Sequence, residues 1–349
     1  MYDNLTFAPR KDATRVVTMQ DALSFIQATQ LQVTPHVLNI GELKINDDGS
    51  LTNGQTRQIT KYGFENFCSI LGIPNPFARK IPQDLLFTNI HRLQEDRSDK
   101  PVVLLERPDG AIANIVKAPY KEVPYGDVLS VLDGREFKYI DIGEQMLTMC
   151  LTFEETQFGL AAEDTFFVGT TVTSSIVWKS KLSMEANIYR TLCGNSFIMP
   201  LVGRAKADYR LGADERLLRF AESVRCYDET VLNRLKQGME LLPTRKMYRR
   251  EVANVWRKLN TLAGEQAADM LIGLDPDTRI ATISAEKTQL SSNRIARLYG
   301  RPVEDPVITD IAFYDVLNAI TASAKAASEQ VKLDLERYAG GLIQNLALS

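Results

Sequence analysis

The sequence predicts an α+β protein: a largely antiparallel sheet with helices, followed by a helical C-terminal region. Three observations support this fold class. β-Rich runs separated by turn residues occupy the middle of the chain, apolar residues recur at helical spacing from Glu215 onward, and no glycine- or serine-rich linker divides the two parts. We therefore expect an α+β domain over residues 1–210 and a helical region over residues 211–349 that packs on it.

The N-terminal segments begin with one helix and one hairpin. Residues 18–30, "TMQDALSFIQATQ", have the apolar spacing of a short amphipathic helix. Residues 37–60 alternate apolar and polar side chains around two turn sequences, Asp-Asp-Gly and Asn-Gly. We expect a β-hairpin there, with one of these two sequences as its turn.

Residues 60–96 predict a helical unit with a break in it. Thr60 is placed to cap the first helix, and Gly72 and Pro74 end it. A further helix is expected to start around Pro82. The side chains that share one face of the first helix are Phe64, Phe67, Cys68 and Leu71.

The middle of the chain predicts strands with one more short helix. In residues 100–120, two apolar runs surround a Pro-Asp-Gly sequence, which is typical of a tight hairpin. Residues 123–133 are expected to form a short helix led by Pro124, and residues 137–153 and 165–180 are β-rich. Helical patterns then cover residues 214–242, 244–264 and 314–347.

Composition restricts the function classes. The 349 residues carry a formal net charge of −3 and an isoelectric point near 5.7, which excludes binding of nucleic acid by bulk positive charge. Any such binding has to come from a local basic patch. No run reaches the roughly 20 apolar residues that span a bilayer, and the first residues lack a secretory pattern. We expect a cytoplasmic protein without a membrane partner.

Cysteine and histidine content argues against most catalytic sites. The four cysteines are far apart, and only two histidines, His36 and His91, are present. Nucleotide-binding, hydrolase and zinc-protease fingerprints are absent from the sequence. We therefore assign no catalytic residue, no metal ligand and no cofactor, and we expect the cysteines to be reduced thiols.

The segment "YRTLCGNSF", residues 189–197, is interpreted as a structural corner. Gly194 and Asn195 tolerate positive φ, so they suit a chain reversal. Cys193 is then a buried apolar residue rather than a nucleophile. Arg190 is the residue of this corner that we expect to be free to contact an anion.

Four segments in their order along the chain resemble the phage- and plasmid-borne proteins of domain of unknown function 932. They are "ITKYGFENFCSILGIPNPFARKIPQDLLFTNIHRL", "KAPYKEVPYGDVLSVLD", "YRTLCGNSF" and "DIAFYDVLNAITASAK". The last departs from the family, because Ala324 and Ala327 lie where many relatives have a histidine. The resemblance implies an origin in a mobile element and a role in DNA metabolism such as recombination, and it carries over no catalytic residue. The matching positions are Tyr120, Pro124, Arg190, Cys193 and Asn195.

The favoured function is binding, or annealing, of single-stranded nucleic acid. Residues 244–259 combine positive charge with aromatic side chains, as phosphate contact plus base stacking requires. Tyr248 is expected to stack on a base, whereas Trp256 is expected to lie in the core. The alternative is an ordinary amphipathic helix with a solvated basic face. The expected binding residues, besides Arg190, are Arg245, Lys246, Tyr248, Arg249, Arg250, Arg257 and Lys258.

Two other function classes stay open. The alanine-rich segment 318–343 predicts one long helix whose small side chains permit close packing, so a self-assembling homo-oligomer is the first alternative. An enzyme of unrecognised type is the second, and only Cys193 and Arg190 support it.

Overall fold

The computed structural model confirms the α+β fold, with antiparallel sheets and a helical C-terminal region. It describes residues 5–11, 13–152, 157–161, 164–191, 195–199, 205–206, 215, 236–274, 276–300, 306–324, 327 and 329–348. No helix within these ranges is long and apolar enough to cross a membrane.

The chain forms two compact units, and each draws residues from both sides of the predicted boundary at residue 210. Unit 1 comprises Met1–Leu151, Val172–Met184 and Ala205–Cys226. Unit 2 comprises Thr152–Thr171, Glu185–Arg204 and Tyr227–Ser349.

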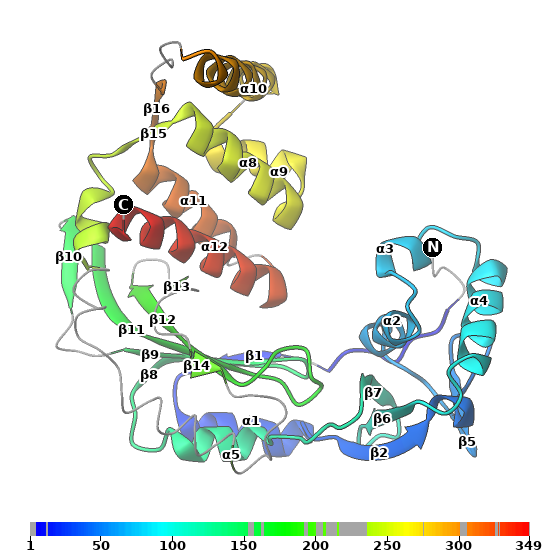
Figure 1. Cartoon of the computed structure of the whole chain (residues 1–349). Coiled ribbons are helices and arrows are strands. Elements are labelled where there is room, and N and C mark those ends of the chain that lie inside the picture. Colours follow the sequence, from blue (N-terminus) through cyan, green and yellow to red (C-terminus); the bar gives the residue numbers. More distant parts are fainter. Residues whose placement is uncertain are drawn as a thin grey trace. The chain divides into compact units, whose positions relative to one another are not determined.

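Unit 1 contains three antiparallel groups of strands with helices between them (Figure 1). Strand β2 pairs with β6 and β6 with β7; β3 pairs with β4 and β4 with β5; β1 pairs with β8 and β8 with β9. Its elements are β1 (Thr14–Val16), α1 (Met19–Thr29), β2 (Thr34–Asn39), η1 (Ile40–Glu42), β3 (Lys44–Ile45), β4 (Leu51–Asn53), β5 (Gln55–Arg57), α2 (Lys61–Ile70), α3 (Asn75–Ala78), α4 (Gln83–Glu95), β6 (Pro101–Glu106), β7 (Ile112–Lys117), α5 (Tyr125–Val131), β8 (Phe137–Ile142), β9 (Leu147–Thr152) and β14 (Ala205–Lys206).

Local signals placed the helices of unit 1 correctly. The Thr60 hydroxyl caps α2 by accepting a hydrogen bond from the backbone N–H of Gly63 at 3.0 Å. The predicted apolar face of α2 is buried, and burial raises the pKa of the Cys68 thiol to about 12. Cys68 and Cys150 are buried thiols, as expected, whereas Cys193 and Cys226 lie outside the described residues.

The two predicted hairpins have different outcomes. The β6–β7 hairpin turns at the Pro-Asp-Gly sequence, where Gly110 has φ +80°. In the segment 37–60, both turn candidates are used, one between β3 and β4 and the other between β4 and β5. Residues 37–39 do not belong to that hairpin, which corrects the prediction. They extend β2 along β6, where their backbone groups find ladder partners.

One carboxyl group of unit 1 predicts a measurable pH dependence. Burial raises the pKa of Glu122 to about 7, and the nearby Asp127 carboxylate adds to this rise. In the unfolded chain the pKa of a glutamate is about 4.3. At pH values between about 4.3 and 7, folding therefore takes up a proton at Glu122. The contribution of Glu122 to the free energy of unfolding is lost as the pH rises through about 7.

Glu122→Gln should therefore raise the melting temperature at about pH 8, because glutamine keeps the shape of the protonated side chain and never ionises. At about pH 3, where glutamate is almost fully protonated in both states, the two proteins should melt alike. Thermal melting of wild type and variant across this range tests the prediction. A gap of the same size at every pH would contradict it.

Unit 2 contains antiparallel strand pairs and most of the C-terminal helices. Strand β10 pairs with β11, β12 with β13, and β15 with β16. Strands β9, β11 and β12 have residues in both units. The elements with residues in unit 2, besides β9, are β10 (Phe158–Ala161), β11 (Asp164–Ser174), β12 (Ser183–Arg190), β13 (Asn195–Met199), β15 (Lys246–Tyr248), α8 (Arg249–Ala263), α9 (Glu265–Ile272), α10 (Pro276–Leu298), β16 (Ile308–Ala312), α11 (Phe313–Ala324) and α12 (Glu329–Leu348).

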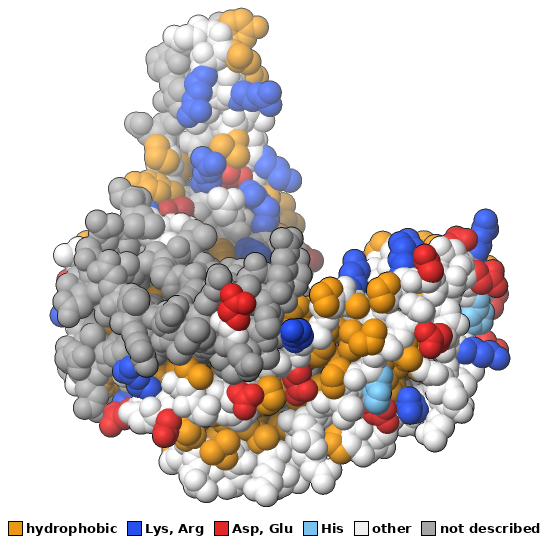
Figure 2. Space-filling model, turned by 60° about the horizontal axis from the view of Figure 1, so that its bottom comes forward, with side chains coloured by type: hydrophobic (Ala, Val, Ile, Leu, Met, Phe, Trp, Pro, Cys, Tyr) orange, Lys and Arg blue, Asp and Glu red, His pale blue; other side chains and the backbone are white. Residues whose placement is uncertain are grey.

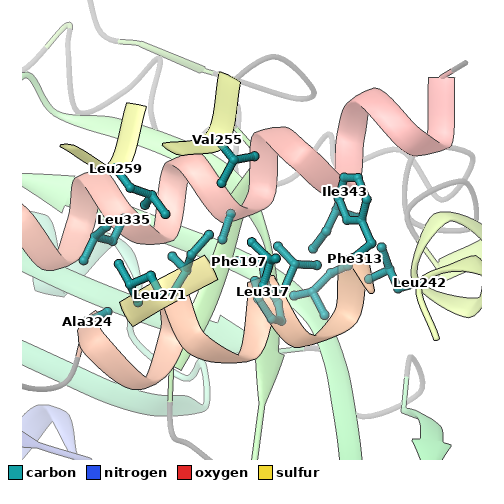
Figure 3. Packing of buried hydrophobic residues seen from close by; sticks show 14 of the residues in the cluster. Phe197, Leu242, Val255, Leu259, Leu271, Phe313, Leu317, Ala324, Leu335 and Ile343 are labelled. Atoms are coloured by element: carbon teal, nitrogen blue, oxygen red, sulfur yellow. The ribbon is translucent and has the colours of Figure 1, made fainter. Parts of the chain in front are cut away.

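The hydrophobic core of unit 2 joins α8, α9, α11 and α12 to the strands β11, β12 and β13. Figure 3 shows Leu259 of α8 beside Leu335 of α12, and Ile343 of α12 beside Phe313 of α11. Helices α11 and α12 pack side by side (Figure 1). This buried apolar surface is the main stabilising contribution to the unit.

Three sequence predictions in this part need correction. Residues 246–248 are a strand and not the start of a helix, because Lys246 and Tyr248 pair with Ala312 and Ile308 of β16. The predicted terminal helix over 318–343 is two helices, α11 and α12, because both halves bury apolar side chains in one core. The strand predicted over 165–180 ends at Ser174. Within the helix predicted over 214–242, the structure describes residues 215 and 236–242. Residues 215 and 236–241 are helical.

Candidate nucleic-acid interface

Helix α8 separates apolar and basic side chains onto different faces. Val252, Val255 and Leu259 are buried in the core of unit 2. Trp256 is half-buried beside them, as expected, and its indole N–H donates to the Asp269 carboxylate at 2.7 Å. The opposite face carries the exposed Arg250, Arg257 and Lys258. The helix thus presents positive charge to solvent along its length.

The first turn of α8 concentrates this charge at the positive end of the helix dipole. Arg249 and Arg250 begin the helix, where a cation is unfavourable and an anion is stabilised. Glu251 is the acidic residue of this turn, but it forms an ion pair with Arg245 at 2.8 Å and accepts from the Tyr248 N–H at 2.8 Å. The Nε atom of Arg249 is buried without a hydrogen-bond acceptor among the described residues. An anion near the exposed Arg250 at this end of the helix is favoured by the helix dipole.

A cleft of about 680 Å³ lies between α8 and the C-terminal half of α10, and we name it the α8–α10 cleft. Arg250, Arg294 and Arg297 line it, and none of them has an ion pair within the described part of the chain. Lysine and arginine side chains in this part of unit 2 are interspersed with hydrophobic ones (top of Figure 2). The other lining residues are Glu286, Gln289, Leu290, Asn293, Leu298 and Pro306.

The sign of the charge in the cleft is set by its arginines. Glu286 is the acidic residue in the described part of the lining, and it is 2% exposed. Arg257 forms an ion pair with it at 2.9 Å, and this pair neutralises the carboxylate. The three lining arginines therefore have no counter-charge from Glu286, and the described lining of the cleft carries net positive charge.

No protein-family model, curated protein or solved structure matches the chain. The resemblance to domain of unknown function 932 stays a prediction. The candidate site therefore depends on the geometry of unit 2 alone.

The predicted binding residues lie in several places. Arg250 lines the α8–α10 cleft and Arg257 supports it through Glu286. Arg245 and Lys258 line cavities on the side of α8 that faces α12. Lys246 is exposed on β15, where its ammonium donates to the Asp310 carbonyl at 2.7 Å. Tyr248 and Arg249 are half-buried where β15 meets α8.

Arg190 is not available to an anion, which corrects the expectation for this residue. The residue is 6% exposed, and its guanidinium donates hydrogen bonds to the Asn318 amide oxygen and to the Tyr314 hydroxyl. The guanidinium also lies over the rings of Phe166 and Tyr314. Arg190 thus joins β12 to α11. Cys193 and Gly194 of the predicted corner lie outside the described residues.

Sequence reasoning missed Arg294 and Arg297. They belong to "SSNRIARLYG", where two arginines three residues apart share one helix face. That spacing is also typical of a solvated helix. Their role depends on the packing of α10 against α8, which brings them opposite Arg250.

Proposed function

We propose that this protein binds single-stranded nucleic acid in the α8–α10 cleft, and that it serves the DNA metabolism of a phage or plasmid. One observation carries the proposal: Arg250, Arg294 and Arg297 surround one cleft, and none of the three has an ion pair within the described residues. Arginine binds phosphate through several directed N–H groups, which suits a nucleic-acid backbone. The resemblance of the sequence to the phage- and plasmid-borne family supports the setting.

The apolar part of the cleft favours a single strand over a duplex. Leu290, Leu298 and Pro306 lie beside the arginines, and Leu298 is 75% exposed. Unstacked bases can contact such side chains with their faces, whereas a duplex hides these faces between its base pairs. The cleft therefore suits a single strand, because its arginines can bind phosphates and its apolar side chains can contact the faces of bases.

Fluorescence anisotropy with a labelled oligonucleotide of about 20 nucleotides tests the proposal. We expect wild-type protein to bind the single strand at about 50 mM salt, with log K falling by about 2 units per tenfold increase in salt, since three phosphate contacts contribute about 0.7 each. The matching duplex should bind more weakly. Absence of binding at about 50 mM salt, or equal affinity for the duplex, would overturn the proposal.

Self-assembly is the second candidate, and exposed apolar side chains at the end of α10 and at the start of β16 favour it. Leu298, Tyr299 and Ile308 are 75%, 73% and 62% exposed. Such residues are typical of protein interfaces when they are close together. Light scattering with and without nuclease separates the candidates, because assembly through protein contacts gives the same particle mass after nuclease treatment.

A further inference from the structure

A second concave site lies between α8 and α12, and we name it the α8–α12 groove. It consists of two adjoining cavities of about 520 and 440 Å³. Both cavities are lined by Lys258, Tyr338, Leu342 and Asn345. Each volume lies within the range of sites that hold a small ligand. All lining residues belong to unit 2.

The walls of the groove combine apolar side chains with amide groups. Leu342 and the ring of Tyr338 are partly exposed and provide apolar surface, whereas Val255 and Phe313, which also line the groove, are buried. Asn254 and Asn345 supply side-chain amides, each with donor and acceptor atoms. The Asn345 amide is exposed and has no hydrogen bond within the described residues. An aromatic ring with polar edges, such as a nucleobase, complements these walls.

Among the described residues, three basic and two acidic side chains line the groove: Arg245, Lys258 and Arg337, and Glu251 and Asp334. Arg337 is paired with Glu185. The carboxylate of Glu251 is already engaged by Arg245 at 2.8 Å. Lys258 is exposed and has no hydrogen bond or ion pair within the part of the chain that the structure describes. Its ammonium is therefore available to a phosphate group next to the apolar wall.

We propose that the α8–α12 groove binds one nucleotide, with the base between Tyr338, Leu342 and the asparagine amides and the phosphate on Lys258. This inference deepens the proposed function and rests on it. Helix α8 contributes Arg250 to the α8–α10 cleft and Lys258 to the groove. A strand whose backbone follows the basic face of α8 can place one unstacked base in the groove.

Calorimetric titration of the full chain with adenosine 5′-monophosphate, adenosine and inorganic phosphate tests this inference. We expect the monophosphate to bind more tightly than adenosine, and phosphate alone to bind least. Lys258→Ala should weaken monophosphate binding about tenfold, which corresponds to one charge-assisted contact, and should leave adenosine binding unchanged. Asn345→Ala should weaken the binding of both. Lys287→Ala, which removes an exposed lysine of α10, is the matched control.

The outcomes separate this inference from the proposed function. If the oligonucleotide binds wild-type protein and the monophosphate does not, the groove is not a nucleotide site and the proposed function stands. If Lys258→Ala and Lys287→Ala bind the monophosphate equally, the groove inference is likewise overturned. If the monophosphate binds in the groove while no oligonucleotide binds, the proposed function fails. Melting curves of each variant establish that it is folded.

Discussion

Replacing Arg250, Arg294 and Arg297 together with alanine should lower the affinity for a single-stranded oligonucleotide about 100-fold at about 0.1 M salt. Each lost phosphate contact reduces the slope of log K against log salt by about 0.7, so three contacts reduce it by about 2. If wild type and variant bind equally at about 1 M salt, where phosphate contacts contribute little, this difference in slope makes their affinities differ about 100-fold at about 0.1 M salt. All three side chains are exposed, so the variant should fold normally.

A matched control removes the same charge elsewhere. Lys80, Arg92 and Lys100 are exposed residues of unit 1, and none has an ion pair within the described residues. Their triple alanine variant should keep most of the wild-type affinity and salt slope. Both variants and wild type are compared by anisotropy titration at several salt concentrations. An equal loss in the two variants would show that overall charge, and not the α8–α10 cleft, governs binding.

The largest effect on stability is expected from Gly340→Ala in α12. A Cβ atom at this position would lie closer than 3.0 Å to the backbone of Ile198 in β13. The backbone cannot rotate away as a side chain can, so α12 has to shift and the packing around it is lost. We expect the free energy of unfolding to fall by about 3 kcal/mol.

The direction of this effect is informative because helix propensity acts the opposite way. Alanine is favoured over glycine inside a helix by about 1 kcal/mol. Gly126→Ala in α5 is the control, since its Cβ would meet no atom within 4 Å, and this variant should be as stable as wild type or more stable. Denaturant titration followed by circular dichroism measures both. A Gly340→Ala protein as stable as wild type would contradict the close approach of α12 to β13.

The parts of the fold that the sequence predicted correctly depend on local chemistry. The Thr60 cap and the turn at Gly110 each depend on a few neighbouring residues. The strand at residues 246–248 was missed because its partner β16 begins about 60 residues later, and a single basic and aromatic segment gives no sign of that partner. The break between α11 and α12 has a similar origin, since both helices pack in a shared core.

The candidate site was predicted only in part, for the same physical reason. Arg250 was identified because charge and aromatic residues are dense around it in the sequence. Arg294 and Arg297 became part of the site through the packing of α10 on α8, which is a tertiary contact. Arg190 was wrongly predicted to contact an anion. Its burial depends on Tyr314 and Asn318, which lie more than 120 positions away, so the neighbouring sequence gives no sign of it.

The way each core is distributed along the chain sets an order for folding during synthesis. The apolar cluster of unit 1 that contains Phe64 draws on residues from Ile40 to Ile115, so all its members have emerged from the ribosome early in translation. The core of unit 2 joins Phe166 to Ile343, and it cannot close until α12 has been made. Strands β11 and β12 must therefore wait, with apolar side chains uncovered, for the helices that bury them. During that interval the nascent chain is most exposed to aggregation and to chaperones.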